Sequence, residues 1–220
     1  MSNTKVFDGS LQHPSSFFVA GQSGSGKSSW VKKLVENKDF LFSKNIQEVI
    51  WCYAHWQSLF EDQSLKDVEF IKGLTLEPYQ RDPKVSRIII IDDMMVDASQ
   101  NKDFVNTFTT NRHANATTVF LTQNLFYGGF RTCSLNASYT VLMKLIRDRQ
   151  QISSFVKQMF PGKHFGEARA AIDDATKEPY SYAFLDHTQK CPDHLRIRAC
   201  IFPDEWMDKG FYAQRVYVPV

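Results

Sequence analysis

The sequence predicts an α/β fold in which a mainly parallel central sheet lies between two layers of helices, a three-layer sandwich. Short apolar runs rich in β-branched residues alternate with amphipathic segments along most of the 220-residue chain, which is the pattern of βαβ units. One of these runs, Arg87–Asp92, contains four consecutive isoleucines, as is typical of a strand buried on both faces of a parallel sheet. Because no internal repeat or linker interrupts the pattern, we expect residues 1–220 to form a single domain.

The first predicted strand is Ser16–Ala20, a short apolar run bounded by Pro14 and Gly21. The segment Lys27–Asn37 follows and separates apolar from charged residues, so it predicts an amphipathic helix. The apolar face of this helix consists of Trp30, Val31, Leu34 and Val35. Glu48–Tyr53 has the composition of a second strand.

The middle of the chain is predicted to continue the alternation. Residues 57–86 are more polar and indicate loops, with a short strand possible near Val68–Ile71. After the isoleucine-rich strand, Phe104, Val105 and Phe108 form the apolar face of a helix. Two further strands are predicted, at Thr117–Thr122 and Ser138–Met143.

The last third predicts two helices and two late strands. Apolar residues from Ile152 to Phe160 recur at helical spacing, and Pro161 and Gly162 end that helix. A short helix is expected over His164–Asp173. Tyr180–Leu185 and Leu195–Phe202 predict strands that could pair with each other in antiparallel fashion.

Composition restricts the class of protein. The net charge of +2, from 26 basic and 24 acidic residues, does not indicate a general nucleic-acid binder, so any such contact would come from a local patch. The four cysteines are scattered and are expected to be reduced thiols. The polar N-terminus and the short apolar runs predict neither a signal peptide nor a membrane span. We therefore expect an intracellular protein that is not secreted.

A complete phosphate-binding loop lies between the first strand and the first helix. Gly21–Ser28 matches the pattern G-x-x-x-x-G-K-[ST] (Walker A). Glycines let the backbone N–H groups turn toward phosphate oxygens, and the helix N-terminus adds a positive dipole end. Lys27 would contact the β and γ phosphates of ATP, and the Ser28 hydroxyl would bind Mg²⁺. The expected nucleotide-binding residues are Gly21, Gln22, Ser23, Gly24, Ser25, Gly26, Lys27, Ser28 and Ser29.

Two aspartates end the isoleucine-rich strand, where a Walker B motif would place them. Asp92 is expected to hold Mg²⁺, directly or through water, and Asp93 to orient the attacking water. Many motor ATPases carry Glu at the second position, so the shorter Asp93 is a departure. Taken alone, the pair would be better explained as the beginning of a turn after a core strand. The upstream phosphate-binding loop favours the functional interpretation.

Further polar residues surround the next strand. Gln123 follows Thr122 at the strand end, where an amide could sense the γ-phosphate or hold the attacking water, or could be an ordinary polar strand end. Arg112 lies near the end of the preceding helix. It could cap that helix within its own subunit, or reach a neighbouring subunit's ATP and stabilise charge in the transition state. Chemistry alone favours the cap.

Taken together, these motifs resemble the FtsK–HerA superfamily, most closely its viral branch, the genome-packaging ATPases of poxvirus-like, adintovirus and Polinton elements. The resemblance extends from about Phe17 to Phe202, and Asn111–Tyr139 is its specific part. It implies a RecA/FtsK-like fold and a ring, expected to be a hexamer. In this superfamily the arginine eleven residues before the strand-end glutamine is a finger supplied in trans, and Arg112 and Gln123 match these two positions.

The leading functional hypothesis is therefore an ATPase that translocates double-stranded DNA into a viral capsid. It would bind ATP, Mg²⁺, DNA and capsid proteins, in the nucleus or cytoplasm of an infected cell and in association with the virion. The basic residues Arg131, Lys144, Arg147, Arg149, Lys157 and Lys163 could face DNA in a central channel or be ordinary solvated surface. A nucleotide-dependent scaffold and a small-molecule or nucleotide kinase remain alternatives.

Overall fold

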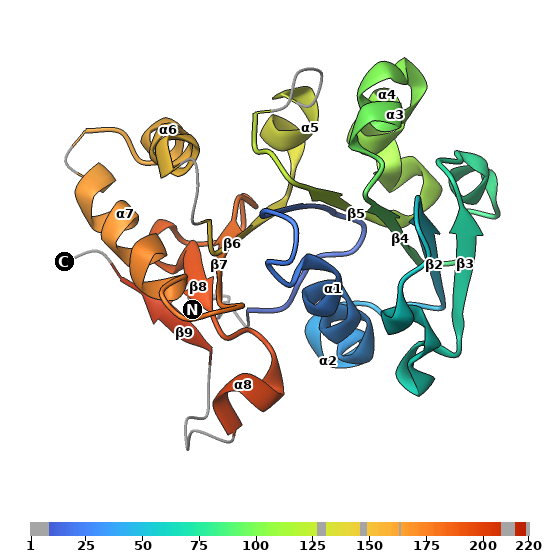
Figure 1. The fold of residues 1–220 in the computed structure, drawn as a ribbon, viewed down its shortest axis with the longest axis horizontal. Helices are drawn as coiled ribbons and strands as arrows, with labels where there is room; N and C mark the ends of the chain where they lie inside the picture. Colours follow the sequence, from blue (N-terminus) through green and yellow to red (C-terminus); the bar gives the residue numbers. More distant parts are fainter. Residues whose placement is uncertain (1–8, 127–130, 146–148, 163, 208–213, 219–220) are drawn as a thin grey trace, which may run out of the picture.

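The computed structural model describes residues 9–126, 131–145, 149–162, 164–207 and 214–218. These residues form a nine-stranded sheet with the order β3-β2-β4-β5-β1-β6-β7-β8-β9 and with helices on both faces (Figure 1). The predicted α/β three-layer fold is therefore confirmed.

Six neighbouring strands of the sheet are parallel, as the sequence predicts. They are β1 (Ser16–Ala20), β2 (Glu48–Tyr53), β3 (Val68–Lys72), β4 (Arg87–Asp92), β5 (Ala116–Thr122) and β6 (Tyr139–Met143). Because parallel strands all end at the same edge of a sheet, the segments that follow β1, β4 and β5 lie close together.

The late strands pair in antiparallel fashion, also as predicted. They are β7 (Tyr182–Asp186), β8 (Ile197–Ala199) and β9 (Arg215–Tyr217), and β7 lies against β6. The sequence did not predict β9, and it placed the start of β7 two residues too early. The expected strand Leu195–Phe202 shortens to β8 because a 3₁₀ turn, η5 (Asp193–Leu195), precedes it and α8 (Pro203–Met207) follows closely.

Helices cover both faces of the sheet (Figure 1). One layer contains α1 (Lys27–Glu36) and α2 (Lys38–Leu41). The opposite layer contains α3 (Met95–Gln100), α4 (Lys102–Thr110), α5 (Arg131–Asn136), α6 (Arg149–Met159) and α7 (His164–Ala175). Short 3₁₀ helices lie in the connections, namely η1 (Ser58–Glu61), η2 (Gln63–Leu65), η3 (Glu77–Gln80) and η4 (Asn111–Ala114). Among helices in the described ranges, none combines the length and the apolar composition that crossing a bilayer requires.

The two layers enclose separate hydrophobic cores, because side chains alternate across each strand. In β1, Phe17 and Val19 face the α1 side, whereas Phe18 and Ala20 face the side of α4 to α7. The isoleucines of β4 alternate in the same way, which is why all four are buried.

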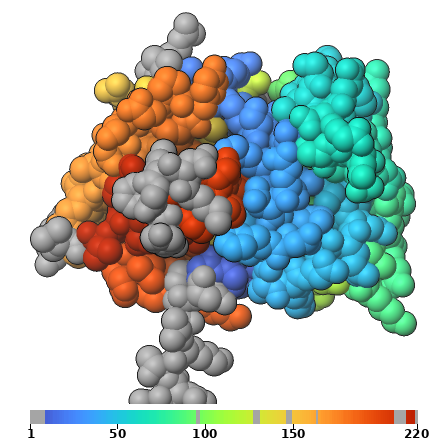
Figure 2. Space-filling model, turned by 90° about the horizontal axis from the view of Figure 1, so that it is seen from below, coloured from blue at the N-terminus to red at the C-terminus, as the bar shows by residue number. Residues whose placement is uncertain are grey.

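The C-terminal part of the chain packs directly against the first helix. Figure 2 shows the red C-terminal segment beside the blue N-terminal third on one face of the molecule. Lys33 of α1 pairs with Asp204 of α8 at 2.7 Å, and the Trp30 ring lies 5.4 Å from that of Phe202. These contacts hold the segment that follows β8 against α1.

Candidate functional site

The segment between β1 and α1 adopts a conformation that only glycine accommodates easily. Gly24 and Gly26 have φ values of +75° and +95°, in the left-handed region that disfavours a side chain. At Gly21, a Cβ atom would lie 2.4 Å from Ser25 Oγ, so no side chain fits there. The first turn of α1 has no intrahelical partners for its N–H groups, so these groups are able to bind an anion.

Lys27 extends back over this loop. Its Nζ donates hydrogen bonds to the carbonyl oxygens of Gly21, at 2.8 Å, and Gln22, at 3.1 Å. Burial lowers the pKa of Lys27, while the nearby carboxylates of Asp92 and Asp93 act in the opposite direction. The loop thus holds a partly desolvated ammonium group close to the position where a phosphate would sit.

Asp92 is buried beside the loop, with 4% of its surface exposed. Its Oδ2 accepts hydrogen bonds from Ser28 Oγ at 3.1 Å, Gln57 Nε2 at 3.1 Å and Trp51 Nε1 at 3.3 Å. Burial raises the pKa of Asp92, and these three hydrogen bonds oppose that rise. The predicted pair of magnesium ligands, Ser28 and Asp92, is therefore brought into direct contact.

Asp93 and Gln123 lie together at the same edge of the sheet. Both side chains are exposed, and Gln123 Nε2 donates to Asp93 Oδ1 at 3.1 Å. Asp93 has a φ of +57°, a strained conformation that is uncommon outside glycine and that often marks functional positions. The amide and carboxylate therefore form a polar pair that could hold one water molecule.

A cavity of about 440 Å³ joins these groups, and its volume is in the range of small-molecule sites. Its walls include Lys27, Ser28, Asp92, Asp93 and Gln123. A larger cavity of about 800 Å³ lies between α7 and β9 and contains none of these residues. The smaller cavity is the better candidate because it combines the inward-turned loop, the cation and the carboxylates.

Four residues of this cavity were not predicted as site residues, namely His55, Gln57, Leu121 and Tyr180. His55 and Gln57 follow β2, whose last residue, Tyr53, pairs with Asp92. Their place after a predicted parallel strand was a signal that could have identified them. Tyr180 precedes β7, and no sequence signal indicated that β7 would lie next to β6.

Solved structures that share this fold were identified by comparison. No protein-family model and no curated protein matches the chain. The genome packaging NTPase B204 from Sulfolobus turreted icosahedral virus 2, in complex with ATPγS, aligns with a TM-score of 0.56 and 15% identity over 84% of this chain and 95% of that one.

The fold is that of a P-loop NTPase. EssC (ATPases 2 and 3) from Geobacillus thermodenitrificans also aligns, with a TM-score of 0.56 and 9% identity over 94% of this chain and 40% of that chain. The cytoplasmic domain of the Type VII secretion ATPase EccC from Thermomonospora curvata aligns with a TM-score of 0.50 and 15% identity, over 80% of this chain and 24% of that chain. These alignments show the fold that the chain shares with these proteins.

In this P-loop NTPase fold, Arg112 lies far from the cavity formed by the same chain. It belongs to η4, which precedes β5, whereas Gln123 follows β5. The seven residues of β5 separate the two by about 20 Å at 3.3 Å per residue. The Arg112 side chain is exposed. It therefore lies at the edge of the sheet opposite to the phosphate-binding loop.

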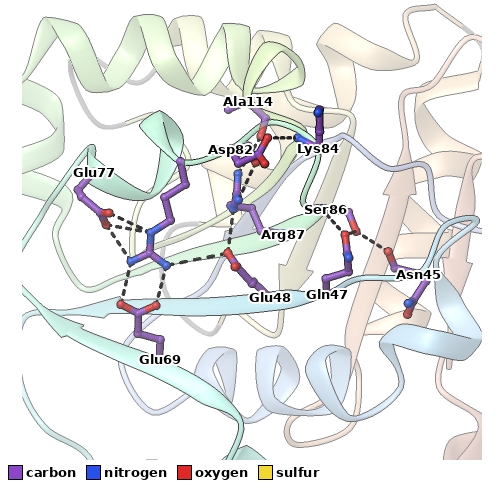
Figure 3. A network of polar contacts seen from close by, with 11 residues as sticks. Asn45, Gln47, Glu48, Glu69, Glu77, Asp82, Lys84, Ser86, Arg87 and Ala114 are labelled. Atoms are coloured by element: carbon purple, nitrogen blue, oxygen red, sulfur yellow. Dashed lines mark hydrogen bonds and ion pairs between the residues drawn. The ribbon is translucent and has the colours of Figure 1, made fainter.

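A buried arginine fixes the turn that carries Arg112 (Figure 3). Arg87 Nη1 donates to the carbonyl of Ala114 at 3.2 Å, and Arg87 Nη2 donates to that of Asp82 at 3.0 Å. Its Nε pairs with Glu48 at 3.1 Å. These contacts hold η4 against the starts of β2 and β4.

The predicted basic residues that the structure describes lie on several different elements. Arg131 begins α5, Arg149 and Lys157 lie on α6, and all three are exposed. Lys144 donates to the Lys177 carbonyl. Arg147 and Lys163 lie outside the described residues.

Proposed function

We propose that this chain is an ATPase that translocates viral double-stranded DNA into capsids and works as a ring. The observation that carries the proposal is the meeting of Lys27, the Ser28–Asp92 pair and the Asp93–Gln123 pair around one cavity. Support for the packaging role comes from the fold shared with a viral genome packaging NTPase over most of both chains, and from the motif resemblance of Asn111–Tyr139.

In the proposed reaction, each of the residues around the cavity has a separate role in ATP binding or hydrolysis. The loop N–H groups and Lys27 bind the phosphates, and Lys27 exchanges its two carbonyl contacts for phosphate oxygens. Mg²⁺, when bound by Ser28 and Asp92, would neutralise charge on the β and γ phosphates. Asp93 accepts a proton from the attacking water, and Gln123 keeps the carboxylate and the water in place.

The position of Arg112 supports the ring. A side chain about 20 Å from its own γ-phosphate site cannot reach ATP bound there, so in this proposal Arg112 acts on the ATP of a neighbouring subunit. The Arg87 contacts hold the η4 turn in place, which would preorganise Arg112 at a subunit boundary. We propose a hexamer in which exposed basic residues of α5 and α6 contact DNA phosphates, in the infected cell and at the capsid.

The test is steady-state ATP hydrolysis with and without duplex DNA. Wild type should hydrolyse ATP faster with DNA, and both Lys27→Ala and Arg112→Ala should lose this activity. His113→Ala, an exposed neighbour in the same turn, is the matched control and should retain it. Mixing the two inactive variants should restore part of the activity, since one interface then pairs an intact loop with an intact arginine.

Three outcomes would contradict the proposal. Nucleotide binding without turnover would favour the scaffold, and phosphate transfer to a small acceptor would favour the kinase. If Arg112→Ala and His113→Ala lost ATPase activity equally, the proposed role of Arg112 in hydrolysis would be wrong.

A further inference from the structure

Tyr180 is an exposed aromatic residue held in an unfavourable backbone conformation. With 71% of its surface exposed, it is the most exposed large apolar or aromatic side chain in the described part of the chain. It is the third residue of a turn from Glu178 to Ser181, with Pro179 second, and its φ is +62°. A turn with proline second and a positive φ third normally carries glycine or asparagine there.

The turn that carries Tyr180 is firmly anchored. The Glu178 carbonyl accepts hydrogen bonds from Ser181 N at 3.3 Å and from Ser181 Oγ at 2.7 Å. The backbone N–H of Lys144, at the end of β6, donates to the Ser181 carbonyl at 3.3 Å. Within the described ranges, the Tyr180 hydroxyl has no hydrogen-bond partner and its ring stacks on no other ring. Backbone strain is thus accepted at a residue whose side chain makes no hydrogen bond or ring contact within the described ranges.

The Tyr180 ring forms part of the wall of the phosphate-loop cavity. It lines the same 440 Å³ space as Lys27 and Asp92. A Cβ atom built on Gly26 would lie 3.3 Å from Tyr180 Cδ1, so the ring packs against the loop backbone where α1 begins. A second cavity, of about 360 Å³, continues on the other side of the turn.

The sheet order gives Tyr180 its orientation relative to the phosphates. Asp93 and Gln123 follow β4 and β5, on one side of β1, whereas Tyr180 precedes β7, beyond β6 on the other side. A triphosphate in the loop with its γ-phosphate toward Asp93 and Gln123 would therefore extend its nucleoside end toward Tyr180.

We propose that Tyr180 stacks on the purine base of the bound nucleotide. The proposal rests on the nucleotide binding proposed above and names the residue that recognises the nucleoside end. Stacking needs only an apolar planar face, so the ring contributes to affinity and the hydroxyl does not.

The test compares two ligands, ATP and inorganic tripolyphosphate, each with Mg²⁺, by competition against a fluorescent nucleotide. Tyr180→Ala should weaken ATP binding about tenfold, the lower part of the range for loss of one base–aromatic stack. It should leave tripolyphosphate affinity within about twofold of wild type, because the phosphate contacts remain. Tyr180→Phe should bind both ligands like wild type.

Tyr180→Gly separates a binding role from a structural one. Glycine relieves the positive φ, so the variant should melt no lower than wild type and yet bind ATP as weakly as Tyr180→Ala. If Tyr180→Ala weakens both ligands equally, or neither, the stacking role is wrong while nucleotide binding stands. If wild type binds neither ligand, the proposed function itself fails.

Discussion

The replacement of Asp92 by asparagine should separate the stability of the fold from its capacity to bind nucleotide. The asparagine side chain has nearly the same volume as aspartate, and its carbonyl oxygen can still accept from Ser28, Trp51 or Gln57. Burial raises the pKa of Asp92, so the fold disfavours the charged form that a magnesium ligand must adopt. We therefore expect Asp92→Asn to melt at the same temperature as ligand-free wild type or higher.

The increase in Tm that Mg-ATP binding should cause can be calculated. A ligand at one hundred times its Kd stabilises a protein by about 2.7 kcal/mol. For a chain of 220 residues, each kcal/mol raises Tm by about 2–4 °C, so Mg-ATP should raise the wild-type Tm by about 5–11 °C. Asp92→Asn should lose most of this increase because the metal loses its anionic ligand.

The assay is thermal unfolding of both proteins, followed by circular dichroism, with EDTA or with Mg-ATP. Asp67→Asn, a substitution of an exposed aspartate, is the matched control and should keep the full shift. If Asp92 served only as a hydrogen-bond acceptor in the core, Asp92→Asn would retain the full Mg-ATP shift, because its carbonyl oxygen can still accept. That result would refute the metal-binding interpretation.

Three further predictions concern the stability of the fold. Burial lowers the pKa of His187 to about 4, so the folded chain keeps it neutral where the unfolded chain takes up a proton. Urea unfolding should show stability lost as pH falls from about 6.5 to 4, with His187 contributing on the order of 2–3 kcal/mol of that loss, and His187→Gln should remove this part. Asp186 and Arg198 pair at 2.7 Å with only 1% and 2% of their side chains exposed. Asp186→Ala should therefore cost about 3–5 kcal/mol in urea unfolding, and a further Arg198→Met should recover part of the loss. Gly21→Ala should lower stability by about 1–3 kcal/mol in the same assay, because its Cβ would overlap Ser25 Oγ.

The sequence predicted most of the parallel part of the sheet well because β1, β2, β4, β5 and β6 are buried on both faces. The runs that became β1, β2 and β4 were predicted with the bounds that the structure has, since continuous apolar segments end abruptly at polar or glycine residues. β9 was missed because its three residues are largely exposed and carry no apolar pattern. Helix α5 was missed because six residues are too few for a helical period.

The sequence predicted those parts of the candidate site in which a recognisable motif follows a predicted parallel strand. The phosphate-binding loop and the Asp92–Asp93 pair could be brought to one edge because β1 and β4 are parallel. Tyr180 could not be found in this way, since it was assigned to a strand and lies instead in the turn before β7. The sequence also implied that Arg112 and Gln123 lie at opposite edges of the sheet, because one precedes and the other follows the same predicted strand.

The most direct test of the account is calorimetric titration of ATP into the wild-type protein and into Lys27→Ala, each with and without Mg²⁺. We predict binding that requires Mg²⁺ in wild type and an affinity about one hundredfold lower in Lys27→Ala, as expected when charge-assisted hydrogen bonds worth about 3 kcal/mol are lost. A folded wild-type protein with no measurable affinity for Mg-ATP, or a Lys27→Ala variant that binds as tightly as wild type, would contradict the account.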